Sequence, residues 1–254
     1  MITTRLFGGM GNQLFQSAMA ISYAKRIECE FHIPDHTEND SIWPPTITHL
    51  TNKNFNPSLQ TYLVQEQKHS FNEIPKYECQ KMNVIFSGYW QSHKYLDDYR
   101  KEILLAFNIP WTLMENTCGV HIRRGDYLKY PTKHPVITKE YLDRAIYQII
   151  DEGADMLIFF SDDMEWASDY AAMMPHKIRY TISTERDPIK DLSLLSSCNH
   201  QIISNSTFGW FGAWLNQAEN KVVITPHEDV WFGPDNRHLD VSDLLPKSWH
   251  RIKY

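Results

Sequence analysis

The chain has 254 residues, of which 42% are hydrophobic and 22% charged, and its formal net charge is −6. This length and apolar content are enough for one large domain or two small ones with buried cores. The acidic balance and the lack of a run of basic residues argue against a general nucleic-acid-binding protein. Locally positive residues in an acidic chain favour a small anionic ligand instead.

The four cysteines, Cys29, Cys79, Cys118 and Cys198, are widely spaced and form no Cys-x-x-Cys pair. This spacing favours reduced thiols in a cytoplasmic protein over a disulfide framework or a zinc site. The residues after Met1 are strand-like, so no signal peptide is expected. No apolar run approaches the ~18 residues of a membrane-spanning helix, although peripheral membrane association stays compatible with the sequence.

The chain opens with a predicted strand over 2–7, the loop Gly8-Gly-Met-Gly-Asn-Gln13 and a helix that continues to residue 24 or 25. Strand, glycine-rich turn and helix are the opening of an α/β nucleotide-type fold. The loop lacks the third glycine of a dinucleotide fingerprint, which disfavours an NAD-type enzyme, and it lacks a P-loop Gly-Lys-Ser/Thr. Two interpretations stay open: the glycines bring backbone close to a ligand, or Asn12 caps a tight turn.

Three further elements are predicted before residue 110: a strand at 31–33, a strand at 84–87 and a helix over 94–107. Residues 35–80 are rich in Pro, Asn, His and Thr, and we interpret them as a loop-rich insertion that shapes a substrate rim. Asn108-Ile-Pro110 ends the helix. The segment 110–117 is the predicted link, which divides the chain into residues 1–112 and 113–254.

The second half alternates strands and helices. Strands are predicted at 118–123, 157–160, 178–182, 201–204 and 222–225, and helices at 141–150, 191–197 and 205–214, with a further helix that follows Asp162 and runs towards Pro175. Asp162 and Glu165 have the spacing of a capping box. Alternating strands and helices predict parallel pairing with right-handed crossovers, and in such sheets ligands bind beyond the carboxyl ends of the strands.

Polar clusters follow three of these strands: Arg123 to Asp126, Ser161 to Asp163, and Asn205 to Thr207. Because they fall at the same end of parallel strands, we expect one shared site. Arginine suits phosphate because its donors form a rigid fork. Ser206, Thr207 and the start of their helix can hold phosphate oxygens as well.

A carboxylate at Asp162 or Asp163 would repel phosphate but can accept the N–H donors of a guanine edge. Other interpretations stay open for each cluster. Arg123 and Arg124 could pair with surface carboxylates, and the clusters that start at Ser161 and Asn205 could be plain helix N-caps.

No metal is expected, because the sequence has no Asp-x-Asp and no His, Cys or carboxylate pair at ligand spacing. A nucleotide diphosphate would then be stabilised by arginine and backbone amides. Neither a Gly-x-Ser-x-Gly elbow nor a kinase motif set is present. Trp210, Phe211 and Trp214 are expected in the core rather than against a ligand.

Four motifs stand out in chain order: Gly8-Gly-Met-Gly-Asn-Gln-Leu-Phe-Gln16, His121-Ile-Arg-Arg-Gly-Asp-Tyr127, Phe160-Ser-Asp-Asp163 and Ser204-Asn-Ser-Thr-Phe-Gly-Trp-Phe-Gly-Ala-Trp-Leu215. Together they resemble the α-1,2-fucosyltransferases of glycosyltransferase family 11, and they span most of the chain. The resemblance implies a GT-B-like α/β fold of two Rossmann-type lobes with a cleft between them. Residues 1–112 would form the acceptor-side lobe and 113–254 the GDP-sugar donor-binding lobe.

The resemblance further implies metal-independent, inverting transfer of L-fucose from GDP-β-L-fucose to the 2-hydroxyl of a terminal β-galactoside, with no cofactor. The implied site residues are His121 near the nucleotide, Arg123 on its diphosphate, Asp162 or Asp163 on guanine, Asn205, Ser206 and Thr207 in the donor-phosphate loop, and Gly9, Asn12 and Gln13 near fucose and acceptor. A different class of function, a non-catalytic relative that binds a nucleotide sugar, stays an alternative.

The acceptor hydroxyl needs a base in the catalytic reading. Related core α-1,6-fucosyltransferases carry a Glu shortly after the Arg-Arg pair, but this chain has Lys129-Tyr-Pro131 there, so that role does not transfer. We expect Asp126 to be the base and take His134 as the second candidate.

Overall fold

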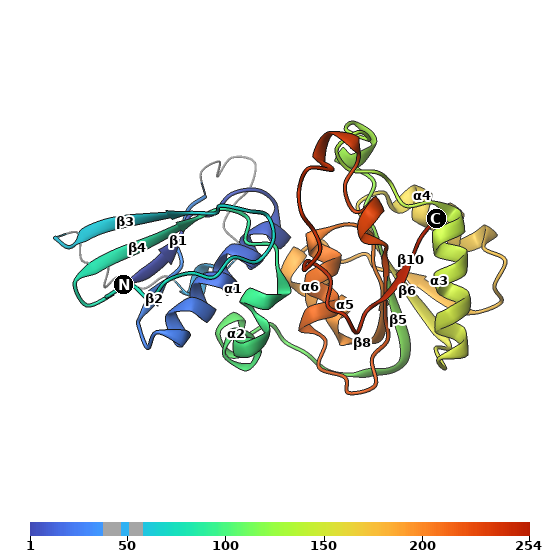
Figure 1. Cartoon of the computed structure of the whole chain (residues 1–254). Helices are drawn as coiled ribbons and strands as arrows, with labels where there is room; N and C mark the ends of the chain where they lie inside the picture. Colours follow the sequence, from blue (N-terminus) through green and yellow to red (C-terminus); the bar gives the residue numbers. More distant parts are fainter. Residues whose placement is uncertain (38–46, 51–57) are drawn as a thin grey trace. The chain divides into compact units, whose positions relative to one another are not determined.

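The computed structural model describes residues 1–37, 47–50 and 58–254 and divides the chain into two compact units, each built on a parallel β-sheet (Figure 1). Unit 1 comprises Met1–Asn108 and Leu239–Leu245, and unit 2 comprises Ile109–His238 and Pro246–Tyr254. The predicted α/β class with parallel strand pairing is therefore confirmed.

Unit 1 contains a four-stranded sheet in the order β2-β1-β4-β3. Its strands are β1 (Ile2–Thr4), β2 (Phe31–His32), β3 (Gln60–Gln65) and β4 (Met82–Ser87), and its helices are α1 (Met10–Arg26) and α2 (Arg100–Phe107). Helix α1 begins at Met10, inside the stretch Gly8–Gln13 that was predicted as a loop, and it is buried over most of its length. It starts earlier than its apolar spacing predicted, because Gly9 is its N-cap and Asn12 already lies in its first turn.

Two predictions for unit 1 need correction. The loop-rich interpretation of 35–80 is wrong for β3, an edge strand whose side chains are mostly exposed, so that no buried face produces an apolar alternation. Residues 38–46 and 51–57 lie outside the described part of the chain. The helix predicted over 94–107 is α-helical only from Arg100, after two 3-10 turns, and Asn108 ends it in the left-handed region with φ 49°.

The prediction of four reduced thiols is wrong for Cys29 and Cys79, which form a disulfide across 50 residues of sequence. Cys29 precedes β2 and Cys79 precedes β4, and these two strands flank β1. The fold therefore brings their Cα atoms to 6.3 Å, within disulfide range. Cys118 and Cys198 are free and buried.

Unit 2 contains a six-stranded sheet in the order β10-β9-β8-β5-β6-β7. The strands are β5 (Met114–Ile122), β6 (Met156–Ser161), β7 (Arg179–Ile182), β8 (Cys198–Ile202), β9 (Val223–Pro226) and β10 (His250–Ile252). The helices are α3 (Lys139–Asp151), α4 (Met164–Met173), α5 (Pro188–Ser197) and α6 (Thr207–Leu215). Only β10 was not predicted; it is a three-residue edge strand in which Ile252 alone is buried.

The strand order of unit 2 is that of a doubly wound dinucleotide-type sheet, in which chain order reverses between two neighbouring strands. Here the reversal lies between β5 and β8, because the chain winds from β5 to β7 and then returns to the other side of β5. The carboxyl ends of β5 and β8 therefore mark the topological switch point, where ligands of such folds bind.

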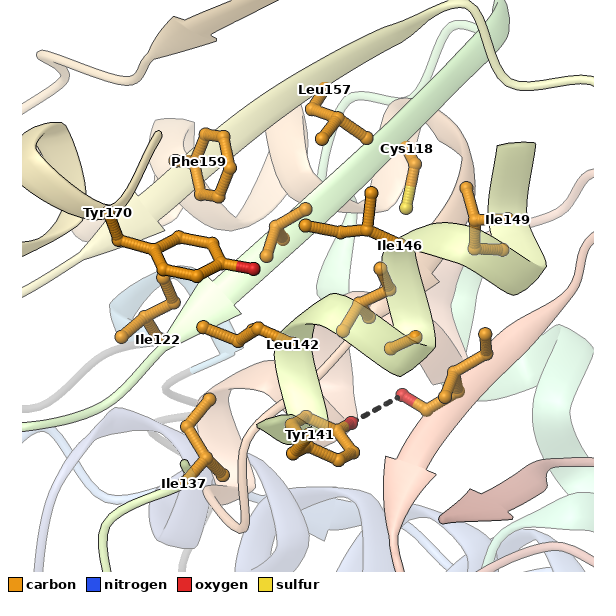
Figure 2. Close-up of a cluster of buried hydrophobic side chains, with 14 of the residues drawn as sticks. Cys118, Ile122, Ile137, Tyr141, Leu142, Ile146, Ile149, Leu157, Phe159 and Tyr170 are labelled. Carbon is orange, nitrogen blue, oxygen red and sulfur yellow. Dashed lines mark hydrogen bonds between the residues drawn. The ribbon is translucent and has the colours of Figure 1, made fainter. Parts of the chain in front are cut away.

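Helices cover both faces of this sheet. Along β6, Leu157 and Phe159 join a core with α3 and α4, whereas Ile158 and Phe160 join a core with Leu195 of α5. Figure 2 shows the first core, in which side chains of α3 face those of β5 and β6. Trp210, Phe211 and Trp214 are buried, so the prediction that they lie in the core is confirmed.

Candidate functional site

The structure brings the three polar clusters of unit 2 together at the carboxyl ends of its strands, and we call this end of a sheet its carboxyl edge, or simply its edge. Strand β5 lies between β6 and β8, and all three run parallel, so their carboxyl ends are neighbours. Ion pairs join the cluster after β5 to the cluster after β6. The Tyr127 hydroxyl after β5 donates to the Asn205 carbonyl after β8 at 3.0 Å. The site therefore lies at the topological switch point.

Arg123 is the central cation of this edge. Its Nη2 atom lies 2.7 Å from Asp126 Oδ1, and its Nη1 atom lies 3.0 Å from Asp162 Oδ2. Its guanidinium carbon lies 5.7 Å from the centre of the Tyr127 ring. The side chain is 29% exposed, and a guanidinium has more N–H donors than these two contacts use. Arg123 is thus held in place and can still donate to a ligand.

Arg124 is held more tightly. Its Nε atom lies 3.0 Å from Asp163 Oδ2, its guanidinium carbon lies 4.2 Å above the Trp166 ring, and its side chain is 16% exposed. Its backbone N–H donates to Asp162 Oδ1 at 2.9 Å. The Arg-Arg pair therefore divides into a cation packed against α4 and a more accessible neighbour, which the sequence did not distinguish.

Asp163, not Asp162, is the N-cap of α4, since its Oδ1 accepts the Trp166 N–H at 3.1 Å. The capping box predicted for Asp162 is wrong because that side chain turns towards the loop after β5. A Cβ atom on Gly125 would lie only 2.5 Å from Asp162 Oδ2, so the loop needs glycine for this close approach. The N-cap interpretation of this cluster is confirmed for Asp163.

His121 lies in β5 beneath the polar edge and is 5% exposed. Its Nδ1 atom is 2.9 Å from the Ser204 hydroxyl, and its ring stacks on Phe208 with 5.4 Å between centroids. Burial, and then the charge of Arg123, lowers the pKa of His121 to about 3, so its imidazole is neutral at physiological pH. A Cβ atom on Gly209 would lie 2.6 Å from Nδ1, which shows how closely α6 packs on this ring.

Asn205 does not cap α6. Its Nδ2 atom donates to the carbonyls of Pro135 and Trp231, both at 2.9 Å, so it ties two loops together beside the switch point. Ser206 is the N-cap residue of α6, and among the described residues its hydroxyl makes no capping hydrogen bond to that helix. The N-cap interpretation of this cluster is therefore wrong for its side chains.

The two candidate bases have different surroundings. Asp126 contacts Arg123 and is 47% exposed. His134 stacks on Tyr127 with 4.8 Å between ring centroids, and within the described part of the chain its buried Nδ1 atom has no hydrogen-bond partner. Burial also lowers the pKa of His134. Asp126 is therefore the more accessible proton acceptor.

The glycine-rich loop lies in unit 1. Gly9 is the N-cap of α1, the Asn12 side chain accepts from Gln91 Nε2 at 2.9 Å, and the Gln13 side chain donates to the Gly8 carbonyl at 3.0 Å. Asn12 is not a helix cap, and the cap interpretation of this loop is wrong. Gly8 has φ 75°, a conformation that glycine adopts readily.

Sequence reasoning missed three side chains that organise the edge of unit 2: Tyr127, Ser204 and Trp166. Tyr127 and Ser204 stand at the end and the start of quoted motifs, so their positions were available as a signal. Trp166 had no such signal, because its role depends on where α4 places its ring. Among residues 1–37, 47–50 and 58–254, no group of three His, Cys, Asp or Glu side chains is arranged to hold a metal ion.

Comparison with known proteins gives the family. The model of glycosyl transferase family 11 matches residues 1–238. The chain belongs to this family. The O-antigen biosynthesis glycosyltransferase WbnK of Escherichia coli is 33% identical over 79% of the chain and 71% of its own length. The alpha-1,2-colitosyltransferase of Escherichia coli is 27% identical over 99% of both. The galactoside 2-alpha-L-fucosyltransferase Sec1 of Mus musculus is 26% identical over 86% of the chain and 65% of its own length.

Solved structures confirm the GT-B fold. POFUT1 in complex with GDP-fucose superposes with a TM-score of 0.51 at 13% identity, over 88% of this chain and 97% of that one. The NodZ alpha-1,6-fucosyltransferase soaked with GDP-fucose gives a TM-score of 0.50 at 13% identity, over 90% and 96%. In the part of the chain that the structure describes, no helix is both long and apolar enough to cross a membrane.

Proposed function

We propose that this chain transfers L-fucose from GDP-β-L-fucose to the 2-hydroxyl of a terminal β-galactoside, with inversion and without a metal ion. Its membership of family 11 supports glycosyl transfer. Two relatives carry names with α-1,2 or galactoside 2-α transfer, and two structural neighbours were studied with GDP-fucose. Because the named relatives are transferases, the alternative of a non-catalytic binding protein is not favoured.

The observation that carries the proposal is the position of Arg123 at the switch point of unit 2. Cleavage of the bond between sugar and diphosphate gives an oxocarbenium-like sugar and moves negative charge onto the leaving GDP. Asp126 and Asp162 hold the guanidinium before the ligand arrives, so little reorganisation is needed to stabilise that charge. A fixed guanidinium can do here what a divalent cation does in metal-dependent transferases.

The start of α6 provides a second source of positive potential. This nine-residue helix begins at Thr207, immediately beyond the carboxyl end of β8, and the N-terminus of a helix attracts phosphate. We assign Ser206 and Thr207 to the donor phosphates. Asn205 would act through position, since it fixes the preceding turn to the carbonyls of Pro135 and Trp231.

Asp162 and Asp163 are assigned to the guanine edge of the donor. Each carboxylate already accepts two hydrogen bonds or ion-pair contacts. A carboxylate has about four lone-pair sites, so both retain capacity for N–H donors. His121, neutral and buried beneath Arg123, would support the donor site through Ser204 rather than through charge.

Asp126 is assigned as the base that takes the proton of the acceptor hydroxyl. It is the more exposed of the two candidates, and its contact with Arg123 keeps its carboxylate at the edge where the donor would react. His134 is less suited, because its ring is stacked on Tyr127 and its Nδ1 atom is buried.

The test is a product analysis. The full chain is incubated in EDTA with GDP-fucose or GDP-colitose and with a panel of β-galactosides and matched β-glucosides. Mass spectrometry and NMR then identify the product and its linkage. We expect an α-1,2-fucosylated galactoside. GDP binding without transfer to any acceptor would overturn the proposal in favour of the binding-only class, and a different linkage would overturn its regiochemistry.

A further inference from the structure

A second side-chain cluster lies at the carboxyl edge of the sheet in unit 1. The order β2-β1-β4-β3 makes β1, β4 and β3 neighbours, and all three run parallel. The loops that follow them, which start at Arg5, Gly88 and Glu66, therefore emerge side by side. By the rule that located the edge of unit 2, this edge is also where a ligand is expected.

Two of these loops, those after β1 and β4, each contribute one ring to an aromatic pair. The rings of Phe7 and Tyr89 pack edge to face with 5.0 Å between centroids. Tyr89 is 41% exposed, so much of its ring faces solvent even though Phe7 fixes its position. A fixed, exposed aromatic ring offers an apolar face, which suits the C–H face of a partner whose other groups are hydroxyls.

A pair of amides joins the first turn of α1 to the loop that follows β4. Gln91 Nε2 donates to Asn12 Oδ1 at 2.9 Å, and Gln91 is 6% exposed. The Gln91 side chain also interacts with His69, whose Nδ1 atom lies 3.2 Å from the Asp240 carbonyl. A Cβ atom on Gly8 would lie 2.6 Å from the Asn12 amide nitrogen, so this amide sits directly against the glycine loop next to Phe7. Amides carry donors and acceptors on one group, as a set of sugar hydroxyls requires.

The loop after β4 is strained and is held in place by Glu66. Trp90 has φ 57°, an unusual value for a bulky residue. The two oxygens of Glu66 accept the backbone N–H groups of Tyr89 at 2.7 Å and Trp90 at 2.9 Å. Trp90 is 2% exposed, so the loop buries this ring while its neighbour Tyr89 turns outward. Strain that is maintained in this way is typical of functional loops.

We propose that Tyr89, Asn12 and Gln91 form a binding subsite in unit 1 for a neutral hexopyranoside, the acceptor sugar. This assignment rests on the proposed function, which requires a galactoside to bind. The C–H face of the sugar would stack on Tyr89, and its hydroxyls would bind the two amides. The three ligand-binding side chains are uncharged, and the Glu66 carboxylate beside them is occupied by backbone N–H groups, so the cluster suits a neutral sugar better than an anion.

The experiment compares Tyr89→Ala, Tyr89→Phe and the control Tyr62→Ala. Tyr62 is 47% exposed on β3 of the same unit and pairs with Tyr77, which makes it a matched exposed tyrosine. Binding of methyl β-galactoside is followed by ligand-observed NMR without donor, and steady-state kinetics are then measured with GDP-fucose. We expect Tyr89→Ala to weaken galactoside binding and raise the acceptor KM about tenfold, with kcat and the GDP-fucose KM changed less than about twofold. Tyr89→Phe and Tyr62→Ala should stay close to wild type.

Unchanged galactoside binding and unchanged acceptor KM in Tyr89→Ala would overturn the proposal. A change in oligomeric state on size exclusion, without a change in galactoside binding, would also overturn it and would identify Tyr89 as a self-association surface. The NMR measurement needs neither donor nor turnover. Failure of the proposed function, seen as no transfer, is therefore distinguishable from failure of the subsite, seen as binding that Tyr89→Ala leaves intact.

Discussion

In both units the carboxyl ends of parallel strands bring polar side chains together, but the two sets of side chains differ in charge. The edge of unit 2 carries Arg123 and Arg124 with their carboxylate partners, whereas the edge of unit 1 carries Tyr89, Asn12 and Gln91. Parallel strands decide where side chains gather in both units. The side chains then decide what can bind: a charged edge suits an anionic diphosphate, and an amide and aromatic edge suits a neutral sugar.

The largest effect is expected at the charged edge. Arg123→Ala should lower transfer on the order of 100-fold or more, because it removes the cation that stabilises charge on the leaving group. Arg123→Lys should recover only part of the rate, since an ammonium lacks the planar fork. The control is Arg179→Ala, which removes an exposed ion pair with Asp155 on the same sheet. Turnover in Arg123→Ala equal to that of the control would rule out the assigned donor site.

Acid should destabilise unit 2 through His121. Its pKa is lowered to about 3 in the folded protein, against about 6.5 when unfolded, so between these values the unfolded state binds the extra proton. Stability from this group is therefore present above pH 6.5 and is lost as pH falls towards 3, by about 2 kcal/mol between pH 6.5 and 4.5. Urea denaturation at several pH values gives the free energy of unfolding as a function of pH. This free energy should depend less steeply on pH in His121→Gln than in the control His250→Gln, since His250 is exposed. Equal slopes in the two variants would contradict the burial of a neutral imidazole.

Gly209→Ala should destabilise the protein by about 1–3 kcal/mol, because a methyl group there overpacks against His121. A double-mutant cycle with His121→Ala isolates the clash. The double variant should lose less free energy of unfolding than the sum of the losses in the two single variants. Chemical denaturation gives the four free energies of unfolding. Simple additivity would mean that α6 does not pack on the imidazole.

The smallest effect is expected at the cap of α4. Asp163→Ala removes the N-cap and the Arg124 ion pair and should lower the free energy of unfolding by about 1 kcal/mol. Asp163→Asn retains a good cap and should lower it by less. Asp187→Ala provides a matched control, because Asp187 caps α5 in the same unit. A Tm for Asp163→Asn as low as that for Asp163→Ala would show that the ion pair, not the cap, is the main contribution.

The sequence predicted unit 2 well and unit 1 less well, and the reason is burial. Leu157 to Phe160 form a continuous apolar run because helices cover both faces of β6, and such a run is visible in sequence. Strand β3 is an exposed edge, so its residues carry no buried pattern. The pairing of Cys29 with Cys79 depends on two strands that flank β1, and sequence spacing does not contain that information.

For the site, too, the sequence predicted the location better than the contacts of each side chain. Its location followed from strand ends, and the motifs that carry the family resemblance named Arg123, His121 and Asp162 or Asp163, which the structure brings together at the carboxyl ends of neighbouring strands. What each side chain contacts was not predictable: Arg124 packs on Trp166, and Asn205 ties two loops together instead of capping a helix. Tyr89 carried no motif signal, because its exposure depends on a strained backbone at its neighbour.

The most direct test is a crystal structure of the chain with GDP bound in the presence of EDTA. We expect the diphosphate to lie at the carboxyl ends of β5 and β8, within hydrogen-bond distance of the Arg123 guanidinium and the first turn of α6. A diphosphate bound elsewhere, with the contacts from Arg123 to Asp126 and Asp162 unchanged and facing no ligand, would contradict it.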